Sequence, residues 1–414
     1  MTRDNHTISW RLALIIIAIT SLVSPYISKI YRGYVGLTIF LLVIGMFVFL
    51  SPVGNYFTAI VGPAYRKNKA VFISIIWFIA GILVTYLRGA NDISYLIQVL
   101  YLPLVFLIGI FLSQNYHYRS FAIISIIAFC FLNIISTGSA IDSTTSARDL
   151  YEESNKGLIY GTSGFWGLIG IFFPLFIAES MKQPKIFRWG LITILLFLAY
   201  KLLFSGFATP IGLLITNLLI IGIIYLFFVL RSTIISPRAI LIILIVLGVV
   251  FFLFSTILKS EYSGMDDVKY RFTNFIEDPA SGGYSKGSGG ISRFKLIKFS
   301  WDSFVNKPLF GNGGNIRSSM YEGINGGHSS SFDFLAVLGI AGGGGAFLFF
   351  VWLSVRNAYR NLRNSKSFSD ICNFAMVVTF IIGGILNPYW QGPILVTYLL
   401  VANIYQSQVF QTGS

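Results

Sequence analysis

The stretch NGGHSSSFDFLAVLGIAGG, residues 325–343, places His328 between a glycine-rich polar segment and the start of an apolar run. The chain has only three histidines. Imidazole titrates near neutral pH, so a histidine at this junction suits the role of a general base. The alternative is a polar residue that, with the serines at 329–331, caps the helix that follows or lies in a solvated loop. The spacing alone leaves both interpretations open.

Arginines form the second group of residues with a chemical role to consider. A guanidinium group donates two parallel hydrogen bonds to phosphate oxygens, which lysine cannot match. Four arginines lie in connections predicted to be external and could converge on one anion: Arg88, Arg271, Arg293 and Arg317. The alternative for each is a surface-paired or snorkelling cation. Nearby glycines would let the backbone approach a ligand closely; they are Gly311, Gly313, Gly326 and Gly327.

Several familiar chemistries lack their motifs. The sequence has no phosphate-binding G-x-x-x-x-G-K-[ST], no H-E-x-x-H and no D-x-D pair. Three scattered histidines do not predict a zinc site, and we expect neither a metal nor another cofactor. Cys130 and Cys372 lie inside apolar runs, where cysteine acts as a small hydrophobic residue.

The composition predicts an all-α integral membrane protein. The chain has 414 residues, of which 55% are hydrophobic and 11% charged, and its mean hydropathy is +0.75. Soluble domains carry about 25% charged residues, whereas an apolar run of about 20 residues spans a bilayer. About twelve transmembrane helices are predicted, at 12–28, 35–51, 71–87, 95–112, 121–136, 161–177, 189–204, 211–230, 239–258, 332–354, 371–386 and 393–409.

The distribution of lysine and arginine predicts the orientation. An amino terminus in the cytoplasm places most basic connections inside, among them those with Arg66, Arg119, Lys182, Arg231 and Arg360. This is the positive-inside pattern, and it puts both termini in the cytoplasm. The formal net charge of +14 is therefore mainly a topology signal. No inner connection is long enough to form a domain, so no nucleic-acid partner is expected.

One long connection interrupts this pattern and divides the chain into three parts. Residues 1–258 hold the predicted helices one to nine, 259–331 form a large external loop, and 332–414 hold helices ten to twelve. Loops of this length are usually functional or disordered. Within it, 292–305 places Phe294, Ile297, Trp301 and Phe304 at helical spacing. This spacing predicts an amphipathic helix against the membrane surface or the bundle.

The segments SRFKLIKFSWDSFVNKPLFGNGG and GGHSSSFDFLAVLGIAGG, within residues 292–343, together resemble the membrane O-antigen polymerase/ligase superfamily. The shared elements are an arginine, an aromatic residue about eight positions later, a P-L-x-G-x-G turn, and a histidine opening an apolar run with G-x-x-G. The topology agrees as well, with about twelve spans, both ends inside and a large external loop before the tenth.

The resemblance implies a glycosyltransferase of the bacterial inner membrane, active on its periplasmic side. Its donor and acceptor would be oligosaccharides on undecaprenyl diphosphate, with a chain-length regulator protein as a further candidate partner. Arg293 and His328 match the motif as the catalytic pair. Arg271 matches an upstream loop arginine, and Arg88, Arg317, Gly311 and Gly313 are candidate substrate-binding residues. The expected reaction is a metal-independent displacement with inversion at the anomeric carbon.

Three readings of the function compete. Ligases of the superfamily carry an arginine in the outer connection between spans seven and eight, where this chain has KLLFSGFATP with Lys201 nearby. This difference favours a polymerase of lipid-linked repeat units, such as O-antigen or a related surface glycan, over a ligase acting on lipid A core. A transporter or lipid-linked-oligosaccharide flippase is the rival from another class. Transporters usually show repeated halves and ionisable groups near the middle of the membrane, whereas this chain shows no clear internal repeat and few charges within its spans.

Overall fold

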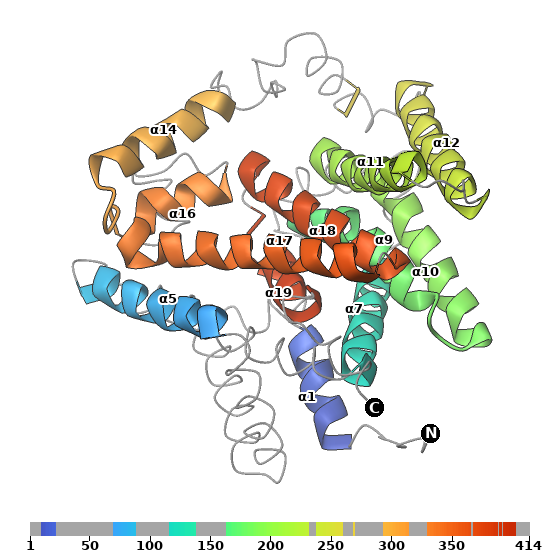
Figure 1. Ribbon diagram of the computed structural model, residues 1–414, viewed down its shortest axis with the longest axis horizontal. Coiled ribbons are helices and arrows are strands. Elements are labelled where there is room, and N and C mark those ends of the chain that lie inside the picture. Colours follow the sequence, from blue (N-terminus) through green and yellow to red (C-terminus); the bar gives the residue numbers. More distant parts are fainter. Residues whose placement is uncertain are drawn as a thin grey trace.

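The computed structural model describes residues 10–21, 69–87, 116–137, 163–231, 237–259, 268–269, 293–313, 329–365, 367–387, 389–390 and 392–402. These residues form helices and their connections, with no β-strand among them (Figure 1). The main helices are α1 (Trp10–Ser21), α5 (Lys69–Leu87), α7 (Tyr116–Thr137), α9 (Ser163–Ser180), α10 (Lys185–Leu203), α11 (Ala208–Arg231), α12 (Pro237–Lys259), α14 (Arg293–Asn306), α16 (Ser330–Leu338), η3 (Ile340–Gly344), α17 (Gly345–Ser365), α18 (Phe368–Leu386) and α19 (Gly392–Val401).

The length and composition of these helices indicate a membrane protein. Within the described ranges, four segments are long and apolar enough to cross a bilayer: His117–Ile135, Lys185–Leu203, Ala208–Phe228 and Phe368–Leu386. Shorter apolar helices add Phe72–Thr85, Phe165–Ser180 and Ile243–Phe252. The predicted spans 35–51 and 95–112 lie outside the described residues. The all-helical membrane class is confirmed, while the count of twelve and the sides of the membrane stay predictions.

Helix α9 forms the centre of the bundle. Nearly all of its side chains from Phe165 to Ser180 are buried, which is typical of a helix that is apolar on every side. It packs against α7, α10, α11, α18 and α19. Gly170 permits the closest of these contacts, because a Cβ there would overlap the carbonyl oxygen of Pro210 at the start of α11. Small residues at such crossings let membrane helices approach closely.

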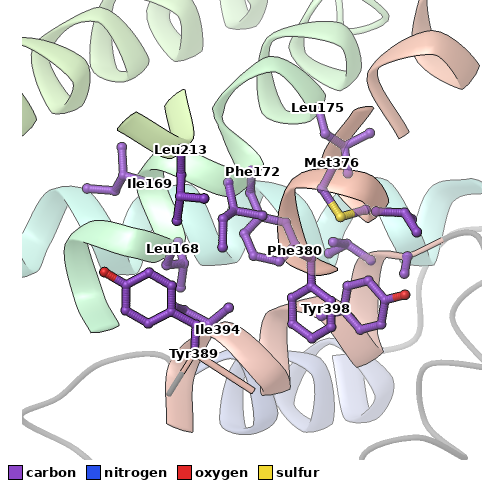
Figure 2. Close-up of a cluster of buried hydrophobic side chains, with 14 of the residues drawn as sticks. Leu168, Ile169, Phe172, Leu175, Leu213, Met376, Phe380, Tyr389, Ile394 and Tyr398 are labelled. Carbon is purple, nitrogen blue, oxygen red and sulfur yellow. The ribbon is translucent and has the colours of Figure 1, made fainter. Parts of the chain in front are cut away.

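Aromatic and branched side chains fill the space between α9, α18 and α19. Figure 2 shows Phe172 of α9 directed toward Phe380 of α18, and Leu168 of α9 above Ile394 of α19. The ring of Phe380 stacks on that of Tyr398 of α19, with centroids 3.7 Å apart and planes 4° apart. These side chains are all buried. The core is therefore built from helices that are distant in the sequence.

A buried polar cluster joins α7, α9 and α18 at one end of the bundle. The carboxylate of Glu179, which is 2% exposed, accepts hydrogen bonds from Lys182 Nζ at 2.8 Å and Ser369 Oγ at 2.7 Å. The guanidinium group of Arg119 lies 3.8 Å from the same oxygen, Oε1. Gln183 Nε2 also donates to Ser120 Oγ at 2.5 Å. These bonds fix the carboxyl end of α9 against its neighbours.

The predicted continuous helix over 332–354 is wrong. Helix α16 ends at Leu338, and the chain turns sharply through η3 before α17 begins. The rings of Phe334 and Phe347 are stacked with centroids 4.9 Å apart, whereas thirteen residues of straight helix would separate them by about 20 Å. Gly339 and Gly343 have φ of 63° and 120°, which breaks the helix. The apolar run is thus a helical hairpin.

The bend pairs with the glycine turn that follows α14. The amides of Ile340 and Ala341 donate to the carbonyl oxygens of Pro308 at 2.9 Å and Leu309 at 2.7 Å. A Cβ on Gly339 would overlap the amide nitrogen of Gly311 and lie 2.6 Å from the carbonyl carbon of Leu309. Two stretches of backbone are therefore in direct contact, with no room for a side chain.

We expect Gly339→Ala to destabilise the protein by about 2 kcal/mol or more. Its φ of 63° and ψ of −177° belong to a region that is essentially restricted to glycine, at a cost of about 1–3 kcal/mol for other residues. The overlap with the turn adds to this cost. Gly248→Ala in α12 is the matched control, because a Cβ there meets nothing within 4 Å. Thermal unfolding in detergent should show a lower midpoint only for the first variant, and equal midpoints would contradict the assignment.

Candidate functional site

The long loop that is predicted to be external contains a helix that packs directly against α16. The helix predicted over 292–305 is present as α14, and its buried face holds Ser300 and Phe304, whereas Trp301 is 44% exposed at the edge of that face. Ser300 Oγ donates to Asp333 Oδ1 of α16 at 2.6 Å. The ring of Trp301 contacts that of Phe332 edge-on, with centroids 6.0 Å apart. The amphipathic helix therefore packs on the bundle through two contacts, the buried hydrogen bond from Ser300 to Asp333 and the neighbouring contact between the rings of Trp301 and Phe332.

Helices α14 and α16 run in the same direction. Ser300 pairs with Asp333, and Asn312 bridges Ser303 and Ala336, each of which lies three residues further along its own helix. Its side chain donates to Ser303 Oγ at 2.6 Å, and its backbone amide donates to Ala336 O at 2.9 Å. Figure 1 shows the helices side by side with their first residues at the same end.

This parallel packing brings together the chain segments of the two predicted catalytic residues. Arg293 is the first residue of α14 and lies about 10 Å along the axis before Ser300. Ser329, the residue after His328, lies about 6 Å along α16 before Asp333. Measured along their common axis direction, the starts of the two helices are therefore offset by about 4 Å. The side chain of Arg293 and the whole of His328 lie outside what the structure describes.

Asp333 is the residue that the sequence analysis missed. Its carboxylate is 1% exposed and accepts hydrogen bonds from Ser300 Oγ at 2.6 Å and the amide of Ser329 at 3.2 Å. One buried carboxylate thus holds both α14 and the residue next to His328. The available signal was an acidic residue inside an apolar run, which is costly in a membrane and usually functional.

The serines beside His328 are used within the protein. Ser329 is the N-cap of α16, but no side-chain cap hydrogen bond forms, and its hydroxyl lies 3.1 Å from that of Ser331. The hydroxyl of Ser330 accepts a hydrogen bond from the amide of Trp390 at 2.8 Å. These contacts anchor the start of α16 to the end of α18 and the segment after it. The hydroxyls therefore help to fix the first residues of α16, which directly follow His328 in the sequence.

Gly311 and Gly313 are held in the contact between the turn and the hairpin. The amide of Gly311 donates to Lys307 O at 3.0 Å, and that of Gly313 donates to Val337 O at 2.9 Å. A Cβ on Gly311 would overlap the carbonyl oxygen of Val337. The space beside Gly311, where a ligand was predicted to approach closely, is thus occupied by the backbone of Val337. Their contact with a substrate stays a prediction.

The remaining predicted binding residues, Arg88, Arg271 and Arg317, lie outside the described residues. The nearest described residues in the sequence are Leu87, the last residue of α5, for Arg88, Lys269 for Arg271 and Gly313 for Arg317. Thr85 Oγ1 donates to Gly342 O at 3.3 Å and Gly313 also faces Thr85, so this end of α5 lies beside the hairpin bend. The bend is one length of α16, about 13 Å, from Ser329.

Lys201, which stands near the place of the ligase arginine, lies within α10, and its ammonium group is 5.9 Å from the ring centroid of Phe197. The connection between α10 and α11 consists only of residues 204–207. No group of three His, Cys, Asp or Glu side chains that could hold a metal occurs within the described ranges. Metal independence of the reaction stays a prediction.

No protein-family model matches the chain, and no curated protein matches its sequence. The resemblance to the O-antigen polymerase/ligase superfamily therefore depends on the motif residues alone.

Proposed function

We propose that the protein polymerises lipid-linked polysaccharide repeat units at the outer face of the bacterial inner membrane. The growing glycan is transferred from undecaprenyl diphosphate to a sugar hydroxyl of the next lipid-linked unit. In this proposal the chain crosses the membrane about twelve times, and both of its termini lie in the cytoplasm. The observation that carries the proposal is the parallel packing of α14 and α16, which places Arg293 and the residue after His328 at one end of two adjacent helices.

The chemistry needs charge stabilisation more than acid catalysis. His328 takes the proton from the attacking hydroxyl, and the oxygen forms a bond to the anomeric carbon. The bond from that carbon to the diphosphate breaks, and its electron pair stays on the diphosphate oxygen. Guanidinium groups stabilise this charge without a metal. The amino ends of two parallel helices add partial positive charge at the same place. Attack from the side opposite the leaving group inverts the configuration.

The buried contacts around α16 supply the rigidity that such a site needs. Asp333 fixes the amide next to His328, and Ser330 fixes the first turn to Trp390. Positioning groups of this kind are worth large factors in rate, because a misplacement of about 1 Å can cost a factor of about 100. The backbone amides that follow the bend at Gly339 donate hydrogen bonds to the carbonyl oxygens of Pro308 and Leu309. Irregular backbone is tolerated within a membrane where the protein satisfies its polar groups in this way.

Incubation of the purified protein with lipid-linked repeat units from its own cells tests the proposal. We expect a ladder of products spaced by one repeat unit, with release of undecaprenyl diphosphate, and the ladder should persist in a chelator of divalent cations. A parallel reaction offers lipid A core as the acceptor. Transfer to the core without a ladder would identify a ligase. Failure to release the diphosphate with either acceptor would contradict glycosyl transfer.

A further inference from the structure

The exposed charges at one end of the bundle are all basic within the described residues. Here α9 meets α10 and α17 meets α18, and the junctions are joined by a hydrogen bond of 2.9 Å from Lys182 Nζ to Ser369 Oγ. The acidic residues at this end are buried, because Glu179 is only 2% and Asp370 only 3% exposed. The cations lie on the surface: Lys182, Lys185, Arg356, Arg360 and Arg363. We refer to these five residues as the basic end.

Three of these cations lie on one stripe of α17. The exposed aromatic and basic residues of its second half each lie three or four positions from another of the set, and so share one side of the helix: Trp352, Arg356, Tyr359, Arg360 and Arg363. The opposite face of the same turns is buried against the bundle through Asn357, Ala358, Asn361 and Leu362. The arginines are therefore not needed for packing, and no ion pair occupies them among the described residues.

The stripe begins where a membrane interface is expected. Trp352 is 52% and Tyr359 55% exposed, and such half-exposed rings are enriched at the headgroup level of bilayers. The guanidinium carbon of Arg356 lies 5.6 Å from the ring centroid of Trp352. The preceding part of α17 is the apolar sequence GAFLFFVWL. The arginines thus follow Trp352 within one to three turns of the helix, where lipid phosphates are expected if the ring lies at the headgroup level.

We propose that the basic end binds the phosphate headgroups of anionic lipids in the leaflet that it faces. Guanidinium forks match phosphate oxygens in two-point fashion. Anionic leaflets attract basic residues near their surface. The aromatic start of the stripe favours a lipid over a soluble phosphate or an acidic protein, since only a lipid places phosphate next to exposed apolar side chains. The inference depends on the membrane character of the protein and not on its proposed activity.

Native mass spectrometry of the detergent-solubilised protein tests this interaction with two lipids, phosphatidylglycerol and phosphatidylcholine. We expect tighter retention of phosphatidylglycerol by the wild type. Arg363→Gln should weaken it about fivefold, and the triple variant R356Q/R360Q/R363Q should weaken it by about fivefold for each arginine. The matched control is K295Q/K298Q, which removes two exposed lysines from α14, away from the basic end.

The single variant keeps the test valid if the triple variant unfolds, which its melting temperature would show. Equal retention of the two lipids by the wild type would overturn the proposal. So would unchanged retention of phosphatidylglycerol by a folded arginine variant, or an equal loss in the lysine control. Displacement of the lipid by an equal concentration of inorganic phosphate would identify a general phosphate site and overturn the lipid assignment.

Discussion

Replacing His328 or Arg293 with alanine should abolish the product ladder, with a fall of about 100-fold or more in the rate of chain lengthening. A positioned general base contributes a factor of about 100 to 10,000, and the loss of one donor to a developing anion costs about 100 to 1,000. Lipid-linked single repeat units should accumulate. The rate is measured from the appearance of the first ladder step in the purified system.

Two variants control for general damage. His117→Ala removes another histidine at the start of α7, and Lys298→Ala removes an exposed cation from α14. Both should lengthen chains at close to the wild-type rate. Normal lengthening by a folded His328→Ala or Arg293→Ala protein would refute the catalytic assignment. Arg293→Lys keeps the charge but not the two-point geometry, so its rate should lie between those of the wild type and Arg293→Ala.

Replacing Asp333 with alanine should release α14 from the bundle. The variant leaves the hydroxyl of Ser300 and the amide of Ser329 without their buried acceptor. A hydrogen bond to a charged group contributes about 1.5–3 kcal/mol, so we expect a loss of about 3 kcal/mol or more. Hydrogen exchange should increase across 293–306 and at the start of α16, and chain lengthening should fall because Arg293 and His328 lose their common support.

The effects of Asp333 can be separated by two further variants. Asp333→Asn keeps one oxygen acceptor and should give intermediate exchange in α14. Asp302→Ala removes an exposed carboxylate from the same helix and should change neither exchange nor activity. Unchanged protection of α14 in Asp333→Ala would show that the aromatic contact of Trp301 with Phe332 is sufficient to dock the helix.

Local sequence patterns predicted the individual helices well. The apolar spacing in 292–305 anticipated α14 to within one residue at each end. Apolar runs of bilayer length anticipated α7, α10, α11 and α18 because membrane helices satisfy their own backbone groups. These features depend on neighbours in the sequence, so hydropathy and periodicity are sufficient to find them.

The missed features depend on partners that are distant in the sequence. Gly339 in an apolar run resembles an ordinary helix-packing glycine, and only the backbone of residues 308–311 shows why the chain bends there. The role of Asp333 depends in the same way on Ser300 of another helix. The sequence motif contains both His328 and Arg293, but it does not show that α14 and α16 begin at the same end of the helix pair. That follows only from the parallel direction of the two helices.

The burial of α9 on every side has a consequence for biogenesis. Its apolar surface is covered in part by α18 and α19, which are synthesised only after the long loop over residues 259–331. A nascent chain that has not yet reached those helices leaves the central helix facing lipid or a chaperone. Truncations before α18 should therefore insert into the membrane and yet be cleared by quality control, so the carboxyl-terminal helices act as the closing step of assembly.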